Sequence, residues 1–128
     1  MKLISLLPAL AAALALAGPV CAATGEETFL DNCSACHQAT GLGIKGAFPA
    51  LAGDPLVKGA PAPLIRTVLA GRGGMPKFSD QLDDAQLAAV LSYVRGAWGN
   101  KAPPVAPADV AAERNRPASK GVAGMQAH

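Results

Sequence analysis

The sequence predicts an all-α protein of about four short helices joined by long loops. No run of residues alternates apolar and polar side chains as a half-buried strand requires. Two segments instead begin with helix-capping signals and continue with apolar residues at helical spacing. The 128 residues suit one globular domain, yet they include only three Phe, one Tyr and one Trp. Because large apolar side chains are so few, we expect another group to fill part of the core.

The first 23 residues have the pattern of an export signal. Lys2 supplies a short positive region, residues 3–17 an apolar run, and residues 20–23 a small-residue cleavage site. We expect cleavage after Ala23, which delivers a periplasmic protein; an uncleaved membrane anchor is the alternative. Cys21 is then discarded with the signal. Its lipidation is disfavoured because the valine before it is a poor residue to precede a lipidated cysteine.

The first predicted helix starts directly after this signal. Thr24, followed three residues later by Glu27, forms a capping box with its acidic residue near the positive end of the helix dipole. Phe29, Cys33 and Cys36 then recur at helical spacing and therefore share one face. We expect this face to meet the core.

Residues 33–37 read Cys-Ser-Ala-Cys-His, the C-x-x-C-H pattern of covalent haem attachment. Two thiols on neighbouring helical turns can add to the two vinyl groups of a haem, and the adjoining His37 can offer its imidazole to the iron. The sequence therefore predicts one haem c, attached through Cys33 and Cys36, with His37 as the proximal iron ligand.

Two other chemistries also use paired cysteines. A thioredoxin-like disulfide pair expects a βαβ setting, and no strand pattern surrounds this segment. A zinc site needs two further ligands, and after His37 the chain offers only one more histidine, His128, at its end. Both readings are disfavoured, and two free thiols would not remain idle in an oxidising compartment.

Met75 is the predicted second ligand of the iron. Of the three methionines, Met1 leaves with the signal and Met125 lies in a Pro/Ala-rich tail. Met75 instead follows a glycine-rich turn, residues 71–74, that lets the backbone approach a flat ligand, and Pro76 stiffens the loop. The alternatives are a methionine that fills a gap in the core, ligation by Met125 or His128, or an open site.

Two more helices follow from local signals. Residues 63–71 have proline near the start, apolar residues at helical spacing and a closing glycine, which predicts a short helix beside the haem. Asp83 and Gln86 form a second capping box. The helix after it carries an apolar stripe at Leu87, Val90, Leu91, Val94 and Trp98.

Together these motifs resemble those of class I cytochromes c, from residue 24 to about residue 100. The matching residues are Gly25-x-x-x-Phe29 and the C-x-x-C-H segment on a first helix, Pro49-x-Leu51 after it, Met75-Pro76, and Tyr93 on a last helix. The resemblance implies the cytochrome c fold, in which the helices surround one covalently bound haem. It also implies that the first and last helices cross near Gly25, Phe29 and Tyr93.

The resemblance further implies roles for residues around the haem. In the family a proline carbonyl accepts a hydrogen bond from the proximal histidine, and Pro49 is the matching position in this chain. Family members often bury a Trp or another fixed donor against the haem propionates, between the two iron ligands. This chain has no Trp there, so Arg66 and Arg72 are the candidates for that role unless both are simply solvated.

From residue 101 onward the composition becomes rich in proline and alanine, which predicts a C-terminal tail over residues 101–128 rather than a second domain. The segment from Tyr93 to Val105 also resembles the end of haem domains in cytochrome subunits of membrane-bound alcohol and gluconate dehydrogenases. Those subunits carry several haem motifs, whereas this chain has one. The chain therefore resembles one such domain by itself.

Charge is distributed unevenly along the chain. Residues 45–77 contain five basic side chains and one acidic side chain, Asp54. This excess either steers an acidic redox partner or is an ordinary solvated surface. The net charge of the whole chain is +2, too small to indicate a nucleic-acid partner.

These features predict an electron carrier rather than an enzyme. An iron held by His37 and Met75 passes single electrons without making or breaking a substrate bond. The expected partners are redox proteins, with a dehydrogenase as donor and an oxidase or another cytochrome of the respiratory chain as acceptor. Membrane contact is expected only through a partner or an uncleaved signal. The alternative is a haem-based ligand sensor or a small peroxidase, each of which needs an open sixth coordination site.

Overall fold

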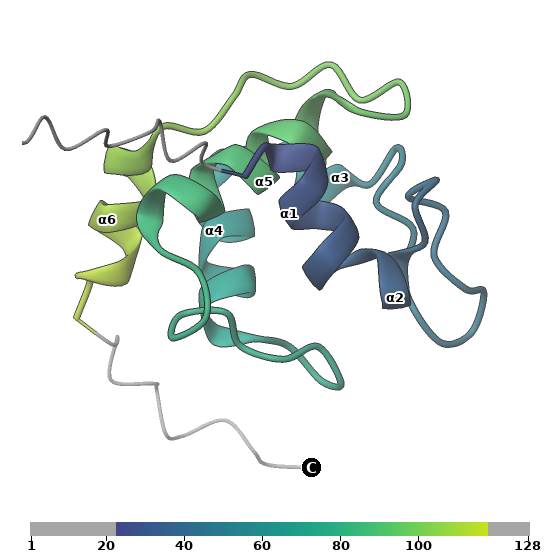
Figure 1. Ribbon diagram of the computed structural model, residues 1–128, viewed down its shortest axis with the longest axis horizontal. Helices are drawn as coiled ribbons and strands as arrows, with labels where there is room; N and C mark the ends of the chain where they lie inside the picture. Colours follow the sequence, from purple (N-terminus) through teal and green to yellow (C-terminus); the bar gives the residue numbers. More distant parts are fainter. Residues whose placement is uncertain (1–22, 118–128) are drawn as a thin grey trace, which may run out of the picture.

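The computed structural model describes residues 23–117, and these form six helices and no strand (Figure 1). The helices are α1 (Gly25–Asn32), α2 (Ser34–His37), α3 (Pro55–Lys58), α4 (Pro61–Ala70), α5 (Asp84–Gly96) and α6 (Pro107–Arg114). The all-α prediction is confirmed. The helices outnumber those expected because α2 and α3 are four-residue turns and α6 lies where a tail was expected.

Both predicted capping boxes are present. The Thr24 hydroxyl accepts from the Glu27 backbone N–H at 3.2 Å, and the Glu27 carboxylate accepts from the Thr24 backbone N–H at 2.7 Å. The bond from the Thr24 backbone N–H, with a smaller contribution from the Thr24 hydroxyl, holds the pKa of the Glu27 carboxyl below its usual value. Asp83 and Gln86 make the same reciprocal pair at the start of α5, with distances of 2.8 and 3.0 Å. The sequence therefore determined where α1 and α5 begin.

Helices α1 and α5 cross with their backbones in close approach. Gly25 lies at the crossing, where a Cβ atom would clash with the Ala89 carbonyl group and lie 3.0 Å from the Cβ of Tyr93. Phe29, one turn along α1, is fully buried, and its ring centroid lies 5.6 Å from that of Tyr93. The crossing implied by the family resemblance is therefore present in the structure.

Helix α5 ends at Gly96, so the prediction that Trp98 continues its apolar stripe is wrong. Ala97 is extended and Trp98 has a φ of 51°, which turns the chain so that the indole packs on the aromatic cluster at the helix crossing. The Trp98 ring centroid lies 5.1 Å from that of Phe29 and 5.7 Å from that of Tyr93. The rest of the stripe is buried as expected, at Leu87, Val90, Leu91 and Val94.

The connection between α2 and α4 contains the short helix α3, which the sequence analysis did not predict. The Asp54 carboxylate caps α3 by accepting from the backbone N–H groups of Leu56 and Val57, at 2.8 and 3.0 Å. Helix α4 begins at Pro61, two residues before the predicted start, because a proline suits the first helical turn. It ends before Gly71, whose φ of 74° closes the helix as expected.

The proline- and alanine-rich segment after residue 100 contributes to the core. Val105 and Val110 are buried, and α6 packs against α4 and α5, on the far side of them from α2 in Figure 1. Glu113 of α6 forms an ion pair with Arg66 of α4 at 3.0 Å. The packed domain therefore extends to the end of α6 and not only to residue 100. Composition did not reveal this because only two valines in the segment are buried.

Several expectations concern residues outside the described range. The export signal, Cys21, Met125 and His128 all lie there, so the expectations about them stay predictions. Within residues 23–117, no helix is both long enough and apolar enough to cross a membrane.

The helix crossing can be tested at Gly25. We expect Gly25→Ala to lower the free energy of unfolding by about 1–3 kcal/mol, because the added methyl group forces the backbones of α1 and α5 apart. Urea unfolding of the haem-loaded protein, followed by circular dichroism, measures this loss. Gly96→Ala is the matched control, since a Cβ at the end of α5 meets no atom of the described residues within 4 Å. Equal stability of the two variants would contradict the close approach.

Candidate functional site

One cavity of about 320 Å³ lies between α1 and α2 on one side and α4, α5 and the loop of residues 71–83 on the other. Four residues that the sequence predicted around the iron, Cys33, Cys36, His37 and Met75, all line it. Most of the wall is apolar and comes from Leu56, Val57, Leu64, Val68, Phe78, Leu82, Val90, Leu91 and Val94. The fold therefore gathers the predicted site residues from separate segments around one apolar space.

His37 ends α2 and is only 8% exposed. Its Nδ1 atom lies 2.9 Å from the carbonyl oxygen of Pro49. A carbonyl can only accept, so Nδ1 carries the proton and Nε2 keeps a free lone pair for a metal. Pro49 therefore occupies the position that the family resemblance implied.

The loop that carries Pro49 folds tightly around the His37 backbone. The His37 carbonyl accepts from the Gly43 N–H at 2.9 Å, and Gly43 has a φ of 62°. A Cβ atom on Gly43 would clash with the carbonyl groups of Phe48 and Pro49. Only glycine permits this approach, which brings the Pro49 carbonyl to the imidazole.

Trp98 fixes the start of the same loop. Its indole N–H donates to the Ala39 carbonyl at 3.1 Å. Its ring also lies directly against Gly41, where a side chain would clash with the indole. The motif-based reading of the sequence placed Trp98 in a helical stripe and missed this role.

Asn100 fixes the end of the loop and is 2% exposed. Its amide nitrogen donates to the carbonyls of Leu51 and Val94, both at 3.0 Å. Its side-chain oxygen accepts from the Gly53 N–H at 2.8 Å. Both N–H groups and the oxygen of this buried amide thus bind backbone groups near the site. Sequence reasoning missed Asn100, and the only signal was its place in the segment that resembles dehydrogenase haem domains.

The two cysteines are half-buried in the cavity wall. Burial, with a smaller contribution from the neighbouring Cys36, raises the pKa of the Cys33 thiol to about 11. A reactive dithiol pair needs a lowered pKa, because the thiolate is the nucleophile. This environment therefore gives no support to the thioredoxin-like alternative.

Met75 lies on the opposite stretch of wall, in the loop between α4 and α5. A small two-way bridge holds it: the Met75 N–H donates to the Arg72 carbonyl at 2.9 Å, and the Arg72 N–H donates to the Met75 carbonyl at 3.2 Å. Gly71 packs against this turn, and a Cβ there would lie 2.7 Å from the Met75 carbonyl oxygen. The glycine-rich turn places the thioether of Met75 in the cavity wall.

The two arginines predicted as partners of the haem propionates have different surroundings in the structure. Arg66 is paired with Glu113 at 3.0 Å and does not line the cavity. Arg72 does line it, and it is the only cationic side chain among the described lining residues. Arg72 therefore remains the candidate of the two.

A family model described as "Cytochrome C oxidase, cbb3-type, subunit III" matches residues 21–94. The chain belongs to this family of c-type cytochrome domains. Membership of the family implies haem c as the cofactor of the cytochrome.

The cytochrome is similar to subunits of larger redox enzymes. It is 35% identical over 91 residues to the cytochrome c subunit of a quinone-type alcohol dehydrogenase from Gluconobacter oxydans, a match that covers 62% of this chain and 19% of the relative. It is 37% identical over 92 residues to the cytochrome c subunit of gluconate 2-dehydrogenase from Pantoea cypripedii, covering 62% and 21%. The chain thus spans about a fifth of these dehydrogenase subunits.

It is also similar to a small cytochrome of comparable length. Cytochrome c-552 of Thermus thermophilus is 37% identical over 107 residues, which cover 71% of this chain and 72% of the relative. Among solved structures, the dihydro-heme d1 dehydrogenase NirN shares 37% identity and a TM-score of 0.50 over 64% of this chain and 17% of NirN. The cytochrome therefore resembles both a domain of large proteins and a small independent one.

The described residues of the cytochrome fit a haem. The donor set consists of two thiols, one imidazole with its Nε2 lone pair free, and one thioether around a single apolar cavity. Arg72 adds a positive charge for acidic groups. Among the described residues, every fully buried side-chain nitrogen and oxygen has a hydrogen-bond partner within the protein.

Removal of the haem tests how far the fold depends on it. Expression without the attachment machinery gives the same chain without haem, and we expect it to lose more than half of its helical circular dichroism signal. Without an occupant, the apolar walls of the cavity face water, and the domain has few large core side chains to compensate. The haem-loaded protein is the control. A native-like spectrum without haem would show that the protein core is sufficient.

Proposed function

We propose that the cytochrome is a periplasmic carrier of single electrons. In this proposal one haem c is attached through Cys33 and Cys36, and its iron is ligated by His37 and Met75. The observation that carries the proposal is the common cavity: these four side chains line it, and a hydrogen bond from His37 Nδ1 to the Pro49 carbonyl leaves Nε2 available to the iron.

Each residue contributes a separate property to electron transfer. When bound, the haem supplies an iron that alternates between the ferric and ferrous states. The Pro49 carbonyl orients the imidazole of His37 and increases its basicity as a ligand. The thioether of Met75 favours ferrous iron and so raises the reduction potential. Because both residues would stay bound in both states, little has to rearrange when an electron moves.

A place between a dehydrogenase and the respiratory chain follows from the relatives. Subunits of alcohol and gluconate dehydrogenases contain domains similar to this chain, and so does the cbb3-type oxidase subunit CcoP of Azospirillum brasilense, at 36% identity over 85 residues. We therefore propose a dehydrogenase as electron donor and an oxidase or another cytochrome as acceptor. The predicted export signal supports the periplasmic location.

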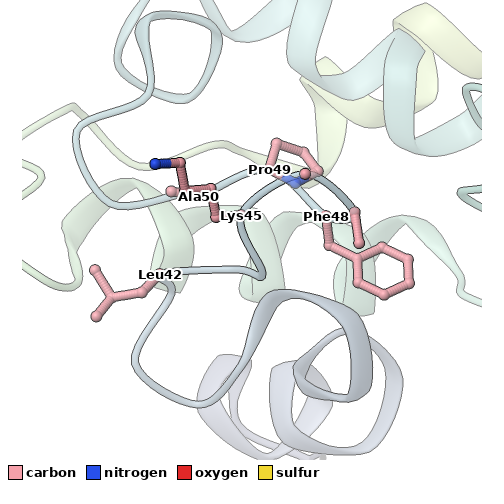
Figure 2. A pocket seen from close by; sticks show the side chains of 7 residues that line it. Leu42, Lys45, Phe48, Pro49 and Ala50 are labelled. Atoms are coloured by element: carbon pink, nitrogen blue, oxygen red, sulfur yellow. The ribbon is translucent and has the colours of Figure 1, made fainter.

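A surface hollow next to the haem cavity is the proposed contact with these partners. It is lined by Leu42, Lys45, Gly46, Ala47, Phe48, Pro49 and Ala50 (Figure 2). Four of these, residues 47–50, also line the haem cavity, so one short stretch of chain separates a bound partner from the cofactor. Leu42 and Ile44 are 64% and 44% exposed, a concentration of apolar surface that is typical of contact sites.

Charge contributes less to this contact than the sequence indicated. Of the five basic side chains between residues 45 and 77, Arg66 is paired with Glu113 and Lys77 with Asp80, at 3.0 and 2.6 Å. Their charges are therefore partly neutralised. We propose that apolar contact around Leu42, more than long-range steering, governs partner binding.

A ligand sensor or a peroxidase needs a vacant sixth position on the iron. The position of Met75 in the cavity wall supports a filled one. A peroxidase also needs a distal acid-base group, and His37 is the only histidine among the described lining residues. These observations favour the electron carrier.

The first experiment is carbon monoxide binding to the reduced, haem-loaded protein, followed by absorption spectroscopy. We expect the wild type to ignore carbon monoxide and Met75→Ala to bind it, because the thioether occupies the sixth position. Met75→Leu keeps the volume of the side chain without its sulfur, so it separates ligation from packing and should bind carbon monoxide as well. Ready binding of carbon monoxide by the wild type would instead show an open sixth position and would favour a sensor or a peroxidase over the electron carrier.

The partner contact is tested by Leu42→Ser. We expect it to slow electron transfer to a purified cbb3-type oxidase about fivefold, as stopped-flow absorption measures, because it removes exposed apolar area from the lining of the hollow. Leu30→Ser is the matched control, since Leu30 is 45% exposed on α1 and lines neither cavity. Equal rates for the two variants would count against this contact surface.

A further inference from the structure

The loop that carries Met75 has few attachments of its own. Within residues 71–83, the bridge between Arg72 and Met75 and a bond from the Phe78 N–H to the Val68 carbonyl, at 3.0 Å, are the main backbone links near the cavity. The turn itself is exposed at residues 72–74, and a Cβ atom on Gly73 or Gly74 would meet no atom of the described residues within 4 Å. A thioether on such a loop needs support from elsewhere to stay over an iron.

Arg114 of α6 supplies bonds to the other end of this loop. Its guanidinium donates to the Ser79 carbonyl and, at 2.9 Å, to the Leu82 carbonyl. Its Nε donates to the Asp84 carboxylate at 2.7 Å, in the first turn of α5. The Arg114 side chain thus binds two backbone carbonyls of the loop and also one carboxylate in α5, the helix that follows the loop. A planar guanidinium fork can make these bonds at once, which a lysine cannot.

The bonds from Arg114 reach the haem cavity through a short segment. Leu82, whose carbonyl accepts from Arg114, lines the cavity with its own side chain, and so does Phe78, the residue before Ser79. The Phe78 carbonyl accepts from the backbone N–H of Leu82 at 3.1 Å, so residues 78–82 form one hydrogen-bonded turn. Holding this turn holds the stretch of chain that begins three residues after Met75.

Helix α6 is itself fixed against the two helices that the loop connects. Val110 is fully buried, and α6 packs against both α4 and α5 (Figure 1). Glu113, next to Arg114, pairs with Arg66 on α4 at 3.0 Å. The helix that carries Arg114 is therefore fixed to α4 and α5, the two helices that the Met75 loop connects.

We propose that Arg114 is a positioning residue for Met75: by tying residues 79–84 to α6, it keeps the loop closed so that the thioether outcompetes outside ligands for the iron. The inference rests on the proposed function, in which Met75 is the sixth ligand. A loop that opens more often leaves the sixth position vacant for a larger fraction of time, and an outside ligand then binds in proportion to that fraction.

The test uses reduced holoprotein and carbon monoxide as the competing ligand. We expect Arg114→Gln to bind carbon monoxide about tenfold faster than wild type, because the charge-assisted bonds that close the loop are lost. Arg116→Gln is the matched control: it removes the same charge near the same helix, and among residues 23–117 the Arg116 side chain bonds only to Glu113, at 3.5 Å. The control should bind carbon monoxide at the wild-type rate.

A second variant keeps the test decisive if Arg114→Gln does not accumulate as holoprotein. Asp84→Asn weakens the hold on the guanidinium but leaves the arginine in place, so we expect a smaller rise in the same rate. Carbon monoxide rates of Arg114→Gln and Asp84→Asn that match those of Arg116→Gln would overturn the inference, even if their urea unfolding showed lost stability. Such a result would assign Arg114 a structural role only.

Met75→Ala in the same series separates this inference from the proposed function. If wild type and Met75→Ala bind carbon monoxide equally fast, Met75 is not the sixth ligand and the proposed function fails. If Met75→Ala is fast while Arg114→Gln stays at the wild-type rate, the ligand is correct and only the role of Arg114 is refuted.

Discussion

The crossing of α1 and α5 is the constraint on which the rest of the domain depends. With hydrogen as its side chain, Gly25 lets the backbone of α1 reach the Ala89 carbonyl, and this contact fixes the distance between the helix that leads into the cysteine motif and the longest helix of the fold. Phe29, Tyr93 and Trp98 then pack around the crossing with ring centroids 5.1–5.7 Å apart. Three of the five aromatic side chains of the chain are therefore concentrated where they fix this geometry.

Buried polar side chains extend this geometry to the loops. Asn100 joins Val94, near the end of α5, to the end of the loop that carries Pro49, and Trp98 binds the start of that loop. Arg95 is 2% exposed and donates to the carbonyls of Val57, Gly59 and Pro103, at 2.7–2.8 Å. Burial of such polar groups costs free energy unless they are hydrogen-bonded. Here each one binds backbone groups, in a fold whose described residues contain no strand to pair them. Side chains at and just after the end of α5 therefore hold several of the segments that form the walls of the haem cavity.

The two sides of the cavity are held by different means. On the His37 side, a short helix and a loop are bound tightly through backbone bonds and the Pro49 carbonyl. On the Met75 side, a glycine-rich loop gains its support from α6, which lies after the part of the chain that resembles the family. A carrier of single electrons needs both ligands to persist when the iron changes its charge. In this cytochrome the side that carries Met75 is tied to a helix that follows the family-like part of the chain.

The sequence by itself predicted the chemistry that we propose for the site, and it determined the helices with local start signals. The C-x-x-C-H spacing, the two capping boxes at Thr24 and Asp83, and the glycine turn before Met75 are local patterns, and each specifies its structure through neighbours a few residues away. The tertiary structure alone decided the roles of Trp98, Asn100 and Arg114. Each bonds to backbone groups more than 30 residues away, and only folding brings such groups together. For the same reason composition could not show that the segment after residue 100 contains a packed helix: its contribution lies in Val110 and Arg114, whose partners are distant in the sequence.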